Sequence, residues 1–322
     1  MQSKPLIRLI ALLLLAIVCT ACGQAAVTPA PATPTSNANA ATATPAPTTP
    51  ASPSPTQEPL AAIVNGQPIA MADYERSLAQ YEADLPAQGI DPNSPEGQAG
   101  MEQTKAWILD WMITEVLIEQ AAEEAGVTVP DEEVDAYLQD MIAESESEEA
   151  FYNQIEAWGY TPEEFRGQVR SQLLGMKMTQ RISDAVPKVT EHVHARHILV
   201  DTPEEAERLL AQLEANADFA SLARAYSQDY STRDNGGDLS FFPRGILVAP
   251  EVEEAAFSLQ PGQISDVVES SLGYHIVKVV ERDPAREVSP ENLRLLQDRA
   301  VQEWIEGLRA QATIQRFVEP SQ

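Results

Sequence analysis

Histidine is the residue type whose placement in this chain first suggests chemistry. The 322 residues contain four histidines, and all of them fall within residues 192–281. His197 and His275 each lie in a segment that alternates apolar with polar residues and is rich in Val and Ile, which predicts a half-buried β-strand. A polar loop between the two segments carries several carboxylate and hydroxyl side chains. Because a carboxylate orients a neighbouring imidazole and fixes its tautomer, the histidines and this loop could form a polar site.

A zinc site is one alternative for the histidines. His192, His194 and His197 place three potential ligands close together in the sequence. On an extended strand, side chains alternate between the two faces, so His192 and His194 share one face and His197 lies on the other. A closed site would need a bend and a fourth ligand, for which the sequence offers no clear residue. We therefore expect no metal.

A phosphate loop is a second alternative, suggested by the glycine pair Gly236-Gly237. The pair lacks the downstream Gly-Lys-Ser/Thr pattern and the strand-to-helix setting of such loops. We therefore expect a turn before a strand, and we expect no cofactor.

The elements that must position these residues form one small α/β segment. Amphipathic stretches at 203–216 and 217–227, a short helix candidate at 250–259 and a turn at 260–265 separate the two strands. In this order, the motifs HILV, YSQDYS, GGDLSFFPRG, EEAAFSLQPGQIS and GYHIVKV resemble parvulin, the small peptidyl-prolyl cis/trans isomerase domain. Five motifs in the right order are far more specific than any one of them.

The resemblance to parvulin implies a catalytic network and an apolar pocket that receives the substrate proline. The network would consist of His197, Asp229, Ser231 and His275. The substrate-binding residues would be Leu239, Phe241, Leu247, Val248, Val252 and Phe257. An alternative stays open, in which the two histidines are buried and satisfy each other in a fold that no longer catalyses.

Two departures from the parvulin pattern bear on specificity. The Lys/Arg-rich loop of phosphate-directed parvulins is replaced by residues 201–205, Asp-Thr-Pro-Glu-Glu, so we expect no phosphate selectivity. Val252 stands where relatives usually place an aromatic residue in the proline pocket, with one extra residue just upstream. The wall of the pocket is therefore expected to differ from theirs.

Residues 1–22 are typical of a lipoprotein signal peptide. A basic start precedes an apolar run that is too short for a comfortable membrane span. Residues 20–23, Thr-Ala-Cys-Gly, resemble a bacterial lipobox, although Cys19 stands where Leu is usual. Cys22 would then be diacylated and would become the mature N-terminus, anchoring an extracytoplasmic protein to a bacterial membrane. Secretion with cleavage elsewhere and an uncleaved anchor are the alternatives.

Residues 23–58 form a predicted tether. Up to residue 57 the segment carries no charge and consists mostly of Ala, Thr, Pro and Ser. Such a composition cannot bury enough apolar surface to offset the entropy lost on ordering, so we expect disorder.

The remaining residues, 59–190 and 285–322, predict a helical region that the parvulin segment, 191–284, interrupts. The region opens with a hairpin at 61–70 and ends with a strand after residue 311. Helices are expected near 71–85, 99–125, 131–145, 148–158, 162–185 and 290–312. Since an isolated amphipathic helix is unstable, we predict that the last one packs on the earlier helices and not on the parvulin segment. We also predict that the final strand pairs with the hairpin.

This layout resembles the envelope foldases of the PrsA and SurA type. The predicted fold class is α+β, with a discontinuous helical, chaperone-like domain and an inserted parvulin domain, itself a small antiparallel sheet surrounded by helices. The formal charge of −28 would repel nucleic acid and anionic lipid head groups. Both cysteines lie at the N-terminus, so the body of the protein holds no disulfide.

The leading hypothesis is a membrane-tethered foldase that isomerises X-Pro bonds in unfolded or nascent secreted polypeptides. The alternative is an ATP-independent holdase chaperone whose parvulin domain is catalytically inactive. The resemblance favours the enzyme because all four polar residues of the network are present.

Overall fold

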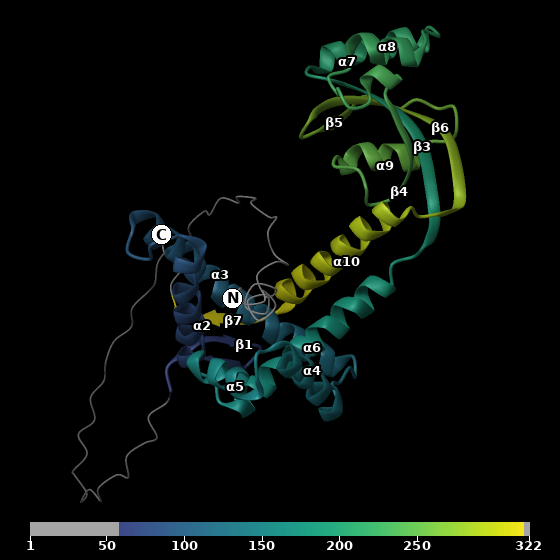
Figure 1. Cartoon of the computed structure of the whole chain (residues 1–322). Coiled ribbons are helices and arrows are strands. Elements are labelled where there is room, and N and C mark those ends of the chain that lie inside the picture. Colours follow the sequence, from purple (N-terminus) through teal and green to yellow (C-terminus); the bar gives the residue numbers. More distant parts are fainter. Residues whose placement is uncertain (1–57, 319–322) are drawn as a thin grey trace, which may run out of the picture. The chain divides into compact units, whose positions relative to one another are not determined.

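The structure, a computed structural model, describes residues 58–318 (Figure 1). The predicted signal peptide, Cys22 and the tether up to residue 57 lie outside the described residues. The chain divides into two compact units, one that ends at Gly175 and resumes at Ala312, and a second that spans Met176–Gln311. Among the described residues, no helix combines the length and the apolar character that a membrane crossing requires.

A three-stranded sheet ties the two ends of the first unit together. Its strand order is β2 (Gln67–Ala70), β1 (Leu60–Val64) and β7 (Ile314–Arg316). The hairpin turn at Asn65-Gly66 has positive φ at both residues, which is the geometry that an Asn-Gly pair favours. The antiparallel pairing of β7 with β1 confirms the prediction that the final strand returns to the hairpin.

The helices of the first unit confirm the sequence-based prediction to within a few residues. They are α2 (Met71–Asp84), α3 (Pro95–Glu124), α4 (Asp131–Glu144), α5 (Glu148–Ala157) and the first part of α6 (Pro162–Asp184). Helix α3 begins earlier than expected because the Ser94 hydroxyl accepts the Gly97 N–H at 3.0 Å and caps it. At the start of α6, Thr161 and Glu164 form a reciprocal capping box.

The second unit is built on a four-stranded antiparallel sheet with the order β4-β3-β6-β5. The strands are β3 (Val189–Val200), β4 (Asp238–Pro243), β5 (Val268–Ser270) and β6 (Gly273–Glu287). Helices α7 (Pro203–Glu214) and α8 (Phe219–Tyr226) cover one face around Ile198 and Ile276. Helix α9 (Pro250–Ser258) covers the other, around Val277 and Val279. This small antiparallel sheet flanked by helices, between segments of a helical region, confirms the predicted fold class.

The last helix, α10 (Pro290–Gln311), lies within the second unit. Its Gln297 amide donates a hydrogen bond to the Ser183 carbonyl of α6, as the predicted packing on earlier helices requires. Arg299, however, donates to the carbonyl of Gly245, and Leu296 lies against the same glycine. The prediction that this helix avoids the parvulin segment is therefore wrong.

Candidate active site

His197 and His275 lie on the two central strands of the second sheet, and both face α9. Ile198 and Ile276 pack with α7 and α8, so the alternate positions on β3 and β6 face the opposite way. His197 is paired with Val277, a member of the cluster around α9. The side chains are almost inaccessible, with 7% of His197 and 1% of His275 exposed.

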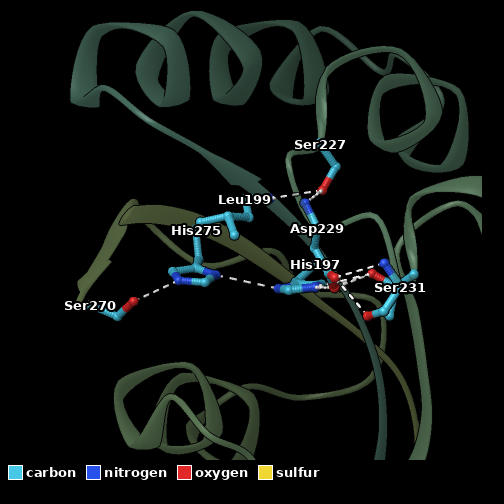
Figure 2. Close-up of polar contacts among 8 residues, drawn as sticks. His197, Leu199, Ser227, Asp229, Ser231, Ser270 and His275 are labelled. Atoms are coloured by element: carbon cyan, nitrogen blue, oxygen red, sulfur yellow. Dashed lines mark hydrogen bonds and ion pairs between the residues drawn. The ribbon is translucent and has the colours of Figure 1, made fainter. Parts of the chain in front are cut away.

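The two imidazoles contact each other directly, as Figure 2 shows. Their Nδ1 atoms are 3.3 Å apart, and the ring planes are inclined by only 16°. A buried polar atom without a hydrogen-bond partner destabilises the fold, so each ring needs a further partner at Nε2. Both Nε2 atoms have such a partner.

Asp229 is the partner of His197. Its Oδ2 atom lies 2.7 Å from His197 Nε2 and also accepts the Thr232 hydroxyl at 2.5 Å. Its Oδ1 atom accepts the hydroxyl and the backbone N–H of Ser231, at 2.6 and 3.0 Å. Partial burial raises the pKa of Asp229, but the hydrogen bonds from Ser231, Thr232 and His197 outweigh it and hold the pKa well below its usual value.

Ser270 is the partner of His275, with its hydroxyl 2.7 Å from Nε2. Burial, reinforced by the neighbouring His197, lowers the pKa of His275 to about 4. His275 is therefore neutral at pH 7. Glu251, in the first turn of α9, and Asp229 act in the opposite direction but do not reverse the shift.

The charge of Asp229 sets the first hydrogen-bond direction in this network, because an ionised carboxylate only accepts and His197 Nε2 must therefore carry a proton. With a single proton on each ring, His197 Nδ1 is an acceptor. His275 Nδ1 then donates to His197, which leaves His275 Nε2 to accept the Ser270 hydroxyl. The network then runs Ser270→His275→His197→Asp229, and each of its buried polar atoms has a partner.

The structure thus brings His197, Asp229, Ser231 and His275 together, and it adds Ser270 and Thr232, which the sequence analysis missed. A weak signal for each existed. Thr232 is three residues after Asp229, a spacing at which hydroxyl and carboxylate side chains meet in turns. Ser270 is paired with Gly273 across the β5–β6 turn, and this pairing brings the Ser270 hydroxyl close to His275.

A buried apolar cluster lies on the same face of the sheet as the histidines. Val252 and Phe257 of α9 are buried in it, while Leu239 and Leu247 pack against it and stay half-buried. Val248, by contrast, is 87% exposed. Of the six residues expected to bind substrate, the structure gathers these four: Leu239, Leu247, Val252 and Phe257.

Phe241 lies on the opposite face of β4. Its ring packs against His194 at a centroid distance of 5.1 Å, and Phe242 takes the place in the cluster instead, edge-on to Phe257. Strict alternation would put Leu239 and Phe241 on one face. Ser240 breaks that alternation because its φ is +57°, and the pairing of β3 with β4 shifts register at the same point.

The glycine pair brings the Asp229 loop close to β3. Gly237 has a φ of +74°, and a Cβ atom there would lie 2.0 Å from the carbonyl oxygen of His197. Its own carbonyl accepts the His197 N–H at 2.8 Å. The pair therefore forms a turn before β4, as expected, and no side chain other than hydrogen fits at Gly237.

The other two histidines point away from His197, as strand alternation predicts. His192 bonds to the Thr190 carbonyl, and His194 bonds to Asp238 at 2.8 Å. Within residues 58–318, no group of three His, Cys, Asp or Glu side chains is arranged to hold a metal ion.

Comparison with known proteins assigns a family to both parts of the chain. Residues 188–281 match the family model of the PPIC-type PPIase domain, and residues 48–179 match that of the SurA-like N-terminal domain. The crystal structure of the peptidylprolyl isomerase PrsA from Bacillus anthracis is 29% identical, with a TM-score of 0.39, and the match covers 62% of this chain and 93% of that one.

Two relatives named foldase protein PrsA match most of the chain. The protein from Caldanaerobacter subterraneus is 34% identical over 239 residues, which is 68% of this chain and 72% of that protein. The protein from Halalkalibacterium halodurans is also 34% identical, and the match covers 64% of this chain and 68% of that protein. At this identity and coverage, the chain belongs to the PrsA family of foldases, with residues 188–281 as its peptidyl-prolyl cis/trans isomerase domain.

Proposed function

We propose that this protein isomerises X-Pro bonds in unfolded secreted polypeptides while tethered to the outer side of a bacterial membrane, without selectivity for phosphate. The observation that carries the proposal is one arrangement on one face of the sheet. The hydrogen-bonded network from Ser270 to Asp229 lies beside an apolar cluster whose edge, at Leu239 and Leu247, is half-open to solvent.

Rotation about an X-Pro bond faces a barrier of about 20 kcal/mol because the bond has partial double-bond character. No covalent step is needed to lower it. A proline ring packed on Leu239 and Leu247 loses water, and so does the adjoining carbonyl, which favours the twisted state in which C–N resonance is lost. The two imidazoles add polarity beneath the bond.

The direct test compares isomerisation of a short X-Pro peptide by the mature chain and by the His197→Ala/His275→Ala double variant. A loss of activity in the double variant supports the site. Unchanged suppression of client aggregation by the same variant would place any holdase activity elsewhere in the chain. A wild-type chain that suppresses aggregation but does not isomerise would favour the holdase hypothesis instead.

The charges around the site support the absence of phosphate selectivity. Asp201, Glu204 and Glu205 follow β3 directly, and Arg196 is already paired with Asp238 at 3.2 Å. Phosphate recognition usually takes a cluster of Lys or Arg side chains. Phosphoserine-Pro peptides should therefore be no better substrates than Ser-Pro or Glu-Pro peptides, and a strong preference for them would overturn the proposal.

The membrane tether rests on the lipobox pattern at Cys22. Each buried acyl CH₂ group contributes about 0.8 kcal/mol, so two or three chains hold a protein firmly. Cys22→Ala should move the protein from the membrane to the soluble fraction, whereas the neighbouring Cys19→Ala should not. Retention of the Cys22 variant on carbonate-washed membranes would exclude lipidation as the anchor.

A further inference from the structure

The loop between β4 and α9, residues 244–248, carries one edge of the apolar cluster. Leu247 packs against the cluster from this loop, while the next residue, Val248, points into solvent. Gly245 has a φ of +90°, a conformation that other residues rarely adopt. A surface loop of this kind holds one position only if its backbone polar groups have fixed partners.

Glu253 of α9 supplies partners for three consecutive backbone N–H groups of the loop. Its carboxylate accepts from Gly245 at 2.8 and 2.9 Å, from Ile246 at 3.1 Å and from Leu247 at 3.2 Å. Hydrogen bonds to an ionised carboxylate are stronger than neutral ones. The side chain therefore holds the loop through its backbone, independently of the loop's own side chains.

The C-terminal helix α10 holds the same loop from a second direction. The Arg299 guanidinium donates to the Gly245 carbonyl at 3.0 Å, and a Cβ atom on Gly245 would lie 2.8 Å from a Leu296 methyl group. Arg299 is itself oriented by Glu303, at 2.9 Å. The peptide groups around Gly245 are thus fixed by α9 on one side and by α10 on the other.

We propose that Glu253 and Arg299 are positioning residues that set the wall of the proline pocket by fixing Leu247. The C-terminal helix, which lies outside the residues that match the isomerase family model, then contributes to substrate binding without touching the substrate. The inference rests on the proposed function, because it takes the cluster edge at Leu239 and Leu247 as the place where the proline ring binds.

We expect substitutions at Glu253 and Arg299 to change substrate affinity and to leave the polar network of the histidines unchanged. Glu253 contacts none of the network residues in the hydrogen bonds described above, so its loss leaves Asp229, His197 and His275 in place. In Glu253→Gln, the amide NH₂ must face one of the loop N–H groups, which turns an attraction into a repulsion. The loop then moves, and Leu247 covers the proline less well.

The test uses the full mature chain and short unphosphorylated X-Pro peptides. We expect Glu253→Gln to raise KM about fivefold and Arg299→Ala about threefold, each with kcat within about twofold of wild type. Arg299→Lys keeps a donor for the Gly245 carbonyl and should restore most of the affinity. The matched controls are Glu254→Gln, which removes only an exposed ion pair with Arg244, and Arg294→Ala, an exposed residue on α10; both should keep the wild-type KM.

Hydrogen exchange of the unaltered protein provides a second test that does not depend on any variant folding. The amides of Gly245, Ile246 and Leu247 should exchange slowly for an exposed loop. Rapid exchange of all three, or a wild-type KM in both Glu253→Gln and Arg299→Ala, would overturn the inference. Failure of the proposed function gives a different result, namely full activity in the His197→Ala/His275→Ala variant.

Discussion

The Nδ1 atoms of His197 and His275 face each other at 3.3 Å, so only one of them can carry a proton when both rings are neutral. In that case Asp229, which accepts from the far side of His197, places the proton between the two Nδ1 atoms on His275. Ser270 completes the arrangement by donating to the remaining nitrogen of His275. One carboxylate therefore fixes the tautomers of both histidines.

Removing the ring of His275 should reduce isomerase activity on short peptides by roughly 10²-fold or less, because no proton is transferred to the substrate. We expect His275→Ala to lower kcat more than it raises KM. Ser270→Ala should have a smaller effect, about three- to tenfold, since it removes only the hydroxyl that donates to Nε2 of the His275 ring. Ser270→Thr retains the hydroxyl and serves as the control. Equal loss in Ser270→Thr and Ser270→Ala would contradict the role of the hydroxyl.

Acidification should destabilise the fold through His275. Its pKa is about 4 in the folded protein and near 6.5 in an unfolded chain. Between these values the unfolded state binds the proton and the folded state does not, so the free energy of unfolding falls as pH decreases from about 6.5 to 4. Urea unfolding at pH 7 and pH 4.5 should show a loss of about 1–3 kcal/mol that is smaller in His275→Ala. An identical pH dependence in both proteins would contradict this assignment.

Glu115 of α3 should have the opposite dependence on pH. Burial, with a contribution from Glu119, raises the pKa of Glu115 to about 8, although Gln168 donates to it. An unfolded chain releases this proton above about pH 4.5, so the free energy of unfolding falls as pH rises from about 4.5 to 8. Glu115→Gln should therefore stabilise the protein by about 1–3 kcal/mol at pH 8 and by little at pH 5.

The control for this prediction is Glu123→Gln, an exposed position on the same helix. Thermal or urea unfolding of the two variants at both pH values makes the comparison. If Glu115→Gln gave the same change in stability at pH 5 and pH 8, ionisation of the buried carboxyl could not be the cause.

Truncation of Leu239 should weaken proline binding. Leu239→Ala removes the methine and both methyl groups from the half-buried edge of the cluster and admits water, which should lower kcat/KM about tenfold, chiefly through KM. Phe241→Leu changes the other face of β4, where the ring contacts His194, and should leave KM unchanged. A larger rise in KM in Phe241→Leu than in Leu239→Ala would contradict this assignment and would indicate that Phe241 contacts the substrate proline.

The sequence by itself predicted the helices, their order and four of the polar residues that the structure brings together, namely His197, Asp229, Ser231 and His275. Helix limits depend on apolar periodicity and on caps such as Thr161 with Glu164, which are local features. The motif order around His197 and His275 was specific enough to identify the family, and Asp229 was found because it belongs to one of those motifs. These signals lie within short stretches of chain.

Only the tertiary structure decided which side chains complete the site. Ser270 reaches His275 through the pairing of β5 with β6, and Phe242 replaces Phe241 because the positive φ of Ser240 shifts the alternation within β4. The contact of α10 with Gly245 likewise joins segments far apart in the sequence. Strand register and helix packing depend on non-local pairing energies, and a shift of one residue reverses the face on which a side chain lies.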